Sequence, residues 1–154
     1  MILQPGAAAP DFALSDQFGR TVGLSELVAR KPVALVFFPL AFSGICQGEL
    51  CELRDNLALF RDASVELVGV SVDSKFALRA WSEQEGYDFP LLADFWPHGA
   101  VAASFGAFRD SVGLASRATF LIGTDGVVRA SFEVPPGEAR PLSAYRDAVA
   151  ALAG

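Results

Sequence analysis

The sequence predicts an α/β fold in which helices flank a central mixed β-sheet, and three observations support this prediction. The continuous apolar run Val33–Phe38 is rich in β-forming residues, as is typical of a strand buried on both faces, and Val65–Val72 is a second predicted buried strand. A segment with helical periodicity follows each of these two strands. Later in the chain, Thr124-Asp125-Gly126 separates two further strand patterns and indicates a hairpin. We expect one domain over residues 1–154, because the chain has no internal repeat and no Pro/Ser-rich linker.

The first half of the chain begins with a short hairpin. Phe12–Leu14 and Thr21–Leu24 are predicted strands on either side of the turn Asp16–Gly19, and they form an N-terminal β-hairpin extension. Val33–Phe38 is a buried strand. A helix is expected after it, because one apolar stripe recurs at helical spacing: Cys46, Leu50, Leu53, Leu57 and Phe60.

The second half continues with a strand and a helix. Val65–Val72 is the strand, and Ser74–Glu85 is an amphipathic helix that ends at Gly86. The other predicted elements are a short helix at Ala100–Phe105, hairpin strands at Ala118–Ile122 and Val127–Val134, and a closing helix at Leu142–Leu152. This order of elements is compatible with a thioredoxin-like fold.

Composition and charge exclude several classes of protein. Hydrophobic residues make up 52% and charged residues 19% of the 154 residues, which excludes a disordered chain. The net charge of −6 disfavours binding to nucleic acid or to an anionic membrane, because both are polyanions. The longest apolar run, Val33–Phe42, is interrupted by Pro39. It is much shorter than the roughly 20 residues that a membrane helix needs.

The amino terminus shows no positively charged signal-peptide start, since the first basic side chain is Arg20. We therefore expect the protein in the cytoplasm, where thiols are kept reduced. For that reason we prefer a reactive role to a structural role for the two cysteines. Two cysteines and one histidine cannot by themselves supply the four ligands of a structural zinc site, so no metal is expected.

The segment Pro39–Cys46 carries the strongest chemical signal. It connects a buried strand to a helix, so Cys46 falls at or near the first helical turn. Free backbone N–H groups and the helix dipole favour a thiolate there, and the thiolate is the nucleophile. Ser43 lies three residues earlier, where its hydroxyl caps the helix or bonds to the sulfur. The alternative is a buried core cysteine with Ser43 as a simple N-cap, and the spacing alone does not decide between them.

A resemblance to a known family bears on this choice. Pro39, Ser43 and Cys46 stand in a Pro-x-x-x-Ser-x-x-Cys pattern that resembles the active-site signature of the peroxiredoxins. The longer segments Phe37–Leu50, Phe89–Val101 and Gly6–Phe12 are similar to the alkyl hydroperoxide reductase E (AhpE) group. The likeness covers nearly the whole chain and implies one peroxiredoxin domain with a thioredoxin-like fold.

The resemblance also implies an active site. Cys46 corresponds to the peroxidatic cysteine, and Pro39, Ser43 and Arg117 complete its pocket. Arg117 lies just before a predicted strand, in Ser116–Phe120, and its alternative is a strand-end charge that faces water. Glu49 is a further pocket candidate, with a solvated helix carboxylate as the equal alternative, and Phe42 is a candidate to contact the substrate.

The chemistry implied by the resemblance needs no metal and no organic cofactor. The Cys46 thiolate attacks the terminal oxygen of hydrogen peroxide, an organic hydroperoxide or peroxynitrite, and a sulfenic acid forms. Arg117 stabilises the thiolate and holds the peroxide oxygens, while Ser43 orients the peroxide.

Cys51 departs from the AhpE pattern, in which a second cysteine is commonly absent. Its spacing from Cys46 resembles the PrxQ, or bacterioferritin-comigratory, branch, which implies resolution through an intramolecular disulfide. On an ideal helix the two Cα atoms would be about 8.6 Å apart. A disulfide tolerates only about 7 Å, so the helix must unwind first. Cys51 shares the polar helix face with Gln47 and Arg54, and the alternative is a bystander thiol or one covered by a neighbouring segment.

Partners follow from the same resemblance. The expected ones are a hydroperoxide, a reducing partner (thioredoxin, a glutaredoxin-like protein or a low-molecular-weight thiol) and a second copy in a homodimer. Two other functions stay open at this point. One is a peroxide sensor that relays oxidation of Cys46 to a partner protein. The other is a structural or chaperone-like protein without redox activity.

Overall fold

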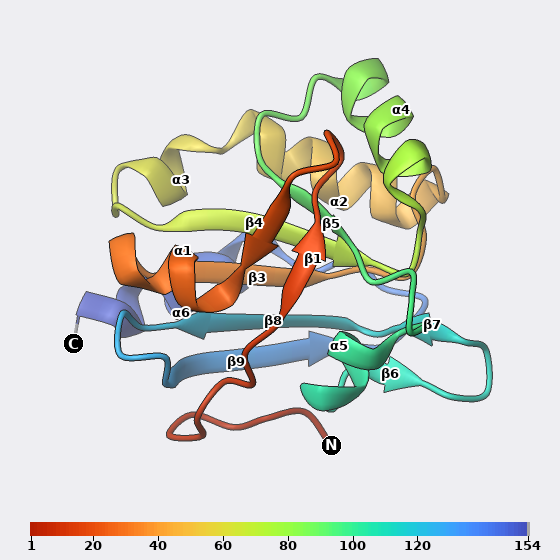
Figure 1. Ribbon diagram of the computed structural model, residues 1–154. Helices are drawn as coiled ribbons and strands as arrows, with labels where there is room; N and C mark the ends of the chain where they lie inside the picture. Colours follow the sequence, from red (N-terminus) through yellow and green to blue (C-terminus); the bar gives the residue numbers. More distant parts are fainter. Residues whose placement is uncertain (154) are drawn as a thin grey trace.

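The structure is a computed structural model that describes residues 1–153. Its main feature is a seven-stranded sheet in the order β2-β1-β5-β4-β3-β8-β9, with a separate two-stranded sheet of β6 and β7 (Figure 1). The strands are β1 Ala13–Ser15, β2 Thr21–Gly23, β3 Val33–Phe37, β4 Glu66–Ser71, β5 Leu91–Ala93, β6 Phe108–Arg109, β7 Leu114–Ala115, β8 Arg117–Ile122 and β9 Val128–Val134. The helices are α1 Leu24–Arg30, α2 Gly44–Asp55, α3 Ala58–Arg61, α4 Lys75–Glu85, α5 Ala100–Ser104 and α6 Leu142–Ala153.

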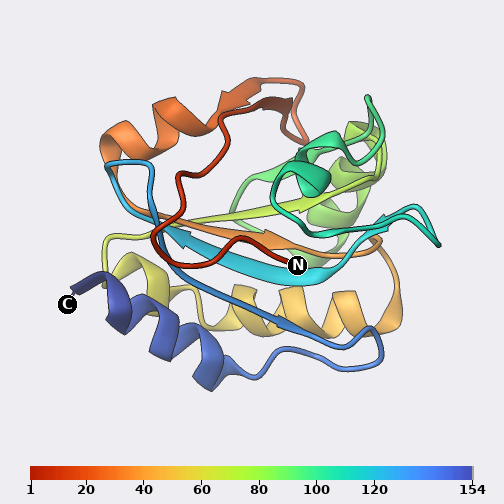
Figure 2. The ribbon, with the colours of Figure 1, turned by 90° about the horizontal axis from the view of Figure 1, so that it is seen from below.

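Strand β3 is an interior strand of the sheet, between β4 and β8, and is buried on both faces. Val33, Leu35 and Phe37 pack into one core cluster, which also contains α1 and α5 side chains. Ala34 and Val36 pack into the other cluster, beneath side chains of α2, α3, α4 and α6. Figure 2 shows α1 on one side of the sheet and α2 and α6 on the other. The continuous apolar run in the sequence therefore reflects two cores, since successive side chains of a strand point to opposite faces.

The pairing of β3 brings distant segments together at one edge. β3 is parallel to β4 and antiparallel to β8, with Val36 opposite Thr119. Extending this antiparallel register by two residues places Arg117 across from Phe38. The carboxyl end of β3, the start of α2 and the first residue of β8 consequently meet at the same place.

The α/β fold class is confirmed, and so are most predicted elements. The N-terminal hairpin is present, and it joins the main sheet where Ser15 pairs with Ala93. Helix α4 begins after an N-cap at Ser74, whose side chain accepts a hydrogen bond from Ala77 N, and ends at Gly86 in the left-handed conformation. Among residues 1–153, no helix has the length and apolarity needed to cross a membrane.

Some details differ from the predictions. The long apolar stripe after β3 belongs to two helices, because α2 ends at Asp55 and α3 begins at Ala58. Helix α1 and strand β5 were not predicted. Both are short, and β5 has only three residues, so neither develops a clear periodic pattern.

Candidate active site

The loop after β3 delivers Cys46 to the first turn of α2. Ser43 is the N-cap residue in an extended conformation, and Gln47 N donates the first helical hydrogen bond to Ser43 O at 2.8 Å. Cys46 therefore lies among the residues whose backbone N–H groups have no partner within the helix. These donors and the helix dipole both favour a negative charge at this position.

Two contacts hold the loop in place from the neighbouring strand. Ala41 N donates to Asp73 Oδ2 at 2.8 Å, and the Ser71 hydroxyl donates to the same oxygen at 2.6 Å. Phe42 has a φ of 66°, the left-handed conformation that non-glycine residues rarely adopt. Its ring lies 6.0 Å from that of Trp81 on α4. The loop is thus fixed at both Ala41 and Phe42, immediately before the helix that carries Cys46.

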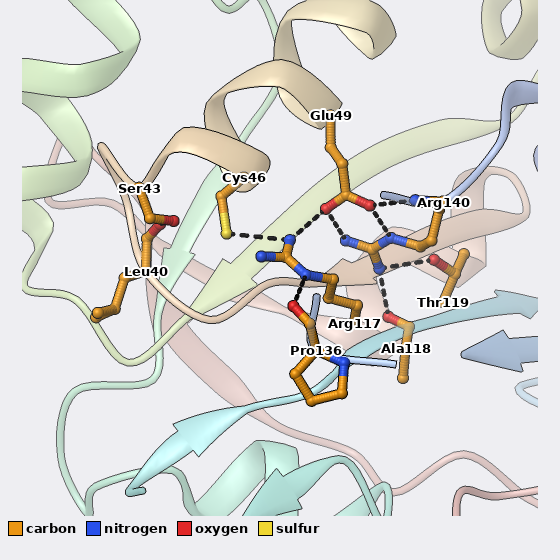
Figure 3. Close-up of polar contacts among 9 residues, drawn as sticks. All are labelled: Leu40, Ser43, Cys46, Glu49, Arg117, Ala118, Thr119, Pro136 and Arg140. Carbon is orange, nitrogen blue, oxygen red and sulfur yellow. Dashed lines mark hydrogen bonds and ion pairs between the residues drawn. The ribbon is translucent and has the colours of Figure 1, made fainter. Parts of the chain in front are cut away.

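The sulfur of Cys46 is fully buried and contacts a positive charge. Cys46 has 0% exposure, and Arg117 Nη1 donates to its Sγ at 3.2 Å (Figure 3). Arg117 itself is only 5% exposed. A guanidinium remains charged at any ordinary pH, so the sulfur faces a fixed positive charge with a hydrogen-bond donor.

A buried carboxylate positions Arg117. Glu49 lies one helical turn after Cys46, and its side chain is only 1% exposed. Its Oε1 accepts from Arg117 Nη1 at 2.6 Å. Arg140 approaches from the other side, where its backbone N, Nε and Nη2 donate to Glu49 at 2.6, 3.0 and 3.1 Å. Arg140 is in turn fixed by bonds from Nη1 to Ala118 O and to the Thr119 hydroxyl. Figure 3 shows Glu49 between the two guanidinium groups.

The buried charges of this cluster are unbalanced. Two buried arginines face one buried glutamate, which leaves one positive charge in excess. Uncompensated charge is costly in a buried site. The Cys46 sulfur lies beside this excess charge, in contact with Arg117 Nη1.

A cleft of about 450 Å³ opens beside this cluster. Pro39 and Arg117 both line it, together with Arg109, Ala115, Ser116, Glu133, Val134, Pro135 and Pro136. Phe42, which we expected to contact substrate, lies outside this lining and packs on Trp81 instead. The cleft gives a small molecule a route to the guanidinium of Arg117.

Three of the predicted site residues have settings that the sequence left open. The Ser43 hydroxyl donates to Leu40 O at 2.8 Å, and it neither caps the helix through its side chain nor bonds to the sulfur (Figure 3). Its oxygen keeps lone pairs that can accept a hydrogen bond. Glu49 is a buried ion-pair partner and not a solvated carboxylate, and Arg117 does not face water. Arg140 was missed, because nothing local marks an arginine in the loop before α6.

The second cysteine has a different environment. Cys51 is half-buried, and its Sγ lies 3.4 Å from Glu85 Oε1 and 3.4 Å from the Tyr87 hydroxyl. On the same helix face, Gln47 Oε1 accepts from Trp81 Nε1 at 3.4 Å and Arg54 Nη1 donates to Glu85 O at 2.6 Å. The end of α4 and the residues after it therefore cover the helix face that the sequence marked as polar. Both cysteines are free.

Known proteins are similar to this chain in sequence and in fold. The AhpC/TSA family matches residues 5–131. The chain belongs to the AhpC/TSA family. It is a peroxiredoxin and hence a thiol peroxidase, an oxidoreductase. Alkyl hydroperoxide reductase E of Mycobacterium tuberculosis is 46% identical over 151 residues, which is 98% of this chain and 99% of the relative.

Solved structures agree with this assignment. The crystal structure of peroxidoxin BcpB from Mycobacterium tuberculosis has a TM-score of 0.85 and 34% identity, and the match covers 98% of this chain and 97% of the other. The reduced 2-Cys peroxiredoxin of Plasmodium vivax has a TM-score of 0.84 and 26% identity, covering 96% and 81% of the two chains. The thioredoxin-like fold expected for this peroxiredoxin is thereby confirmed.

Proposed function

We propose that this peroxiredoxin reduces hydrogen peroxide, organic hydroperoxides and peroxynitrite through a sulfenic acid at Cys46, and that Cys51 resolves it. The observation that carries the proposal is the 3.2 Å contact between Arg117 Nη1 and the buried Cys46 sulfur. It joins a nucleophile at a helix N-terminus to a fixed cation that also lines an open cleft.

The first step follows from this geometry. The thiolate attacks the terminal peroxide oxygen, a S–O bond forms and the O–O bond breaks. The sulfur is oxidised, and the leaving alkoxide or hydroxide takes a proton to become an alcohol or water, whereas peroxynitrite releases nitrite. Arg117 stabilises the charge that moves onto the leaving oxygen, as preorganised donors do in other active sites. The free lone pairs of Ser43 accept a hydrogen bond from the peroxide O–H, and Pro39 keeps water from the sulfur.

In the second step Cys51 attacks the Cys46 sulfur, the S–O bond breaks and a disulfide and water form. Both cysteines belong to the unbroken helix α2, so its first turns must unwind. Gly44 and Gly48 flank Cys46 and make no side-chain packing contacts that would be lost. Glycine also lowers the helical preference of this segment by about 1 kcal/mol per residue relative to alanine.

A specific observation favours a second candidate, a one-cysteine peroxidase or a peroxide sensor. Helix α2 is regular from Gly44 to Asp55, and Cys51 is held away from Cys46 by Glu85 and Tyr87. In that case the Cys46 sulfenic acid would persist and react with an external thiol or a partner protein.

Intact mass after one equivalent of hydrogen peroxide on the reduced protein distinguishes these mechanisms. Loss of two hydrogens is expected and means a disulfide between Cys46 and Cys51. Gain of one oxygen would contradict resolution by Cys51 and support the second candidate. No change within seconds would contradict the peroxidase step itself. The Cys51→Ser variant serves as a control, because it should keep the first turnover and gain one oxygen.

The proposal extends to partners and location. A disulfide product needs a dithiol such as thioredoxin or a glutaredoxin-like protein, whereas a persistent sulfenic acid also accepts a low-molecular-weight thiol. Steady-state turnover with each reductant ranks them. The cycle requires a reducing compartment such as the cytoplasm, which cell fractionation tests.

We also propose a homodimer. Phe76, Phe95 and Trp96 are 74%, 55% and 80% exposed, and all three line one surface groove. Exposed clusters of large apolar side chains are typical of protein contacts. Sedimentation should give a dimer mass for the wild type, and Trp96→Glu should shift the equilibrium to monomer.

A further inference from the structure

One face of α2 is held by polar contacts to a single neighbouring segment. Residues 47, 51 and 54 lie on this face, at the spacing of successive helical turns. Gln47 contacts Trp81 on α4, and Cys51 and Arg54 contact the last residue of α4, Glu85. The opposite face of α2 is apolar and packs into the core. Release of this face of α2 therefore requires these polar contacts to break.

The segment that makes the contacts is packed against its neighbours. Gly86 adopts φ 69°, the left-handed conformation that ends α4, and this turn brings both Glu85 and Tyr87 against Cys51. Tyr87 is only 7% exposed. Its ring lies 5.0 Å from Trp81 and stacks at 5.5 Å on Phe89. The Tyr87 hydroxyl is therefore held at a fixed place beside the sulfur.

The hydrogen bonds from Cys51 to Glu85 and Tyr87 oppose its use as a nucleophile. A carboxylate only accepts hydrogen bonds, so the contact between Cys51 Sγ and Glu85 Oε1 requires the neutral thiol as donor. Burial raises the pKa of Tyr87, which keeps its phenol neutral beside the sulfur. A thiol is a poor nucleophile, and attack on a sulfenic acid needs the thiolate.

Movement of Cys51 to Cys46 must break all of these bonds. Unwinding the first turns of α2 displaces Cys51 from Glu85 and Tyr87 and strains the bond from Arg54 to Glu85 O. None of the three partners contacts Cys46, whose sulfur is held by Arg117. The contacts therefore oppose resolution without affecting the step that consumes peroxide.

We propose that Arg54, Glu85 and Tyr87 form a latch that holds Cys51 away from Cys46 and sets the rate of disulfide formation. This inference rests on the proposed function, in which Cys51 resolves the sulfenic acid. The three residues are positioning residues, since they act through Cys51. By slowing resolution, the latch lengthens the life of the sulfenic acid. A second peroxide then oxidises more of it to sulfinic acid and is itself reduced to alcohol or water.

The test compares the wild type with Glu85→Ala/Tyr87→Phe. Tyr87→Phe keeps the buried ring, and Glu83→Ala is the matched control, since Glu83 lies on the same helix and pairs only with Arg79 among the described residues. Rapid quenching at increasing times, followed by intact mass, gives separate rates for sulfenic acid and disulfide formation. Excess peroxide then gives the sulfinic acid fraction.

We expect disulfide formation to be about fivefold faster in the double variant, the effect of losing one net hydrogen bond. The sulfenic acid rate should stay within twofold, and less sulfinic acid should form. Glu83→Ala should match the wild type. If the double variant does not fold, Arg54→Gln provides the same test from the helix side.

Three results would overturn the latch. A wild type that forms disulfide, with variants that are no faster, contradicts the latch alone. Slower disulfide formation in the variants would show that Glu85 or Tyr87 assists the attack. A wild type that stops at one added oxygen contradicts both the latch and resolution by Cys51.

Discussion

Two cysteines on one helix, five residues apart, have opposite surroundings in this peroxiredoxin. Cys46 is fully buried at the helix start and accepts a hydrogen bond from the Arg117 guanidinium. Cys51 is half-buried, one turn and a half further along, and faces the Glu85 carboxylate and the neutral Tyr87 phenol. A cation favours the thiolate and a carboxylate favours the thiol. We therefore propose that the neighbours of each sulfur, and not the sulfur itself, determine which one attacks peroxide.

The same helix provides both environments because one of its faces meets strand β8 and another meets the end of helix α4. Cys46 and Glu49 point toward β8, where Arg117 starts the strand, whereas Cys51 and Arg54 point toward the end of α4. The excess positive charge of the buried cluster is confined to the first of these faces. The predictions below remove or transfer the features that make the two sites differ.

Removal of the Arg117 cation should have the largest effect. Arg117→Gln loses the charge beside Cys46 and the donor for the leaving oxygen, so the second-order rate constant for hydrogen peroxide should fall about 100- to 1000-fold. Stopped-flow kinetics on the pre-reduced variant measures it. Arg109→Gln is the matched control, because Arg109 lines the same cleft without contacting the sulfur. A decrease of less than tenfold would contradict a role of Arg117 in peroxide reduction.

Neutralising Glu49 should change stability more than it changes the reaction. Glu49→Gln leaves Arg117 and Arg140 buried without a counter-charge, which should lower the free energy of unfolding by about 3–5 kcal/mol. Peroxide reduction should decrease about tenfold, because Arg117 loses the partner that positions it. Urea denaturation and stopped-flow kinetics give the two values. Glu52→Gln on the same helix should leave the free energy of unfolding and the peroxide rate constant near the wild-type values. Equal losses in Glu49→Gln and Glu52→Gln would contradict the role of the buried cluster.

A cation placed beside Cys51 should make this thiol more reactive, as Arg117 is expected to do for Cys46. In the Cys46→Ser background, Glu85→Lys replaces the acceptor beside Cys51 with a positive charge. Alkylation of Cys51 by iodoacetamide at pH 7 should then be several-fold faster, up to about tenfold for a half-buried pair. Glu83→Lys in the same background controls for the net charge. Equal alkylation rates in the two variants would show that Glu85 does not control this thiol.

The smallest effect concerns the pH dependence of stability. Burial raises the pKa of Tyr87, so the folded protein retains the phenol proton at a pH where the unfolded chain loses it. Stability from this group is present below pH 10 and decreases as the pH rises above it. The stability lost from this group by pH 11 is at most about 1.4 kcal/mol. Tyr87→Phe should lose less stability than the wild type between pH 9 and pH 11 in urea titrations. Parallel curves of stability against pH for the two proteins would show that the Tyr87 hydroxyl is exposed to solvent.

The sequence predicted the elements that have long periodic patterns and the residues that share a motif. Val33–Phe38 and Ser74–Glu85 matched β3 and α4 closely, because burial on two faces and a Ser N-cap with a terminal Gly leave clear local signals. Helix α3 was merged with α2, because the apolar spacing continues across the break at Asn56. A helix end without glycine or proline is hard to detect from the periodicity alone.

The site could be predicted only as far as its local motif. Pro39, Ser43 and Cys46 lie in one loop, whereas Arg140 is 91 residues from the carboxylate that it binds. No local pattern reports such a contact. The cover over Cys51 was missed for the same reason, since it comes from Glu85 and Tyr87, more than 30 positions away. Helical spacing gave the correct face for Cys51, but long-range packing determined what that face contacts.

The central claim is that surroundings make Cys46 the peroxide-reactive sulfur, and the two single-cysteine proteins test it most directly. Cys51→Ser retains only Cys46, and Cys46→Ser retains only Cys51. Their second-order rate constants with hydrogen peroxide should be measured by stopped-flow under identical conditions at pH 7. We predict that Cys51→Ser reacts at least about 100-fold faster, as expected from an Arg117 donor that acts on only one sulfur. Rate constants within a few-fold of each other would contradict the account.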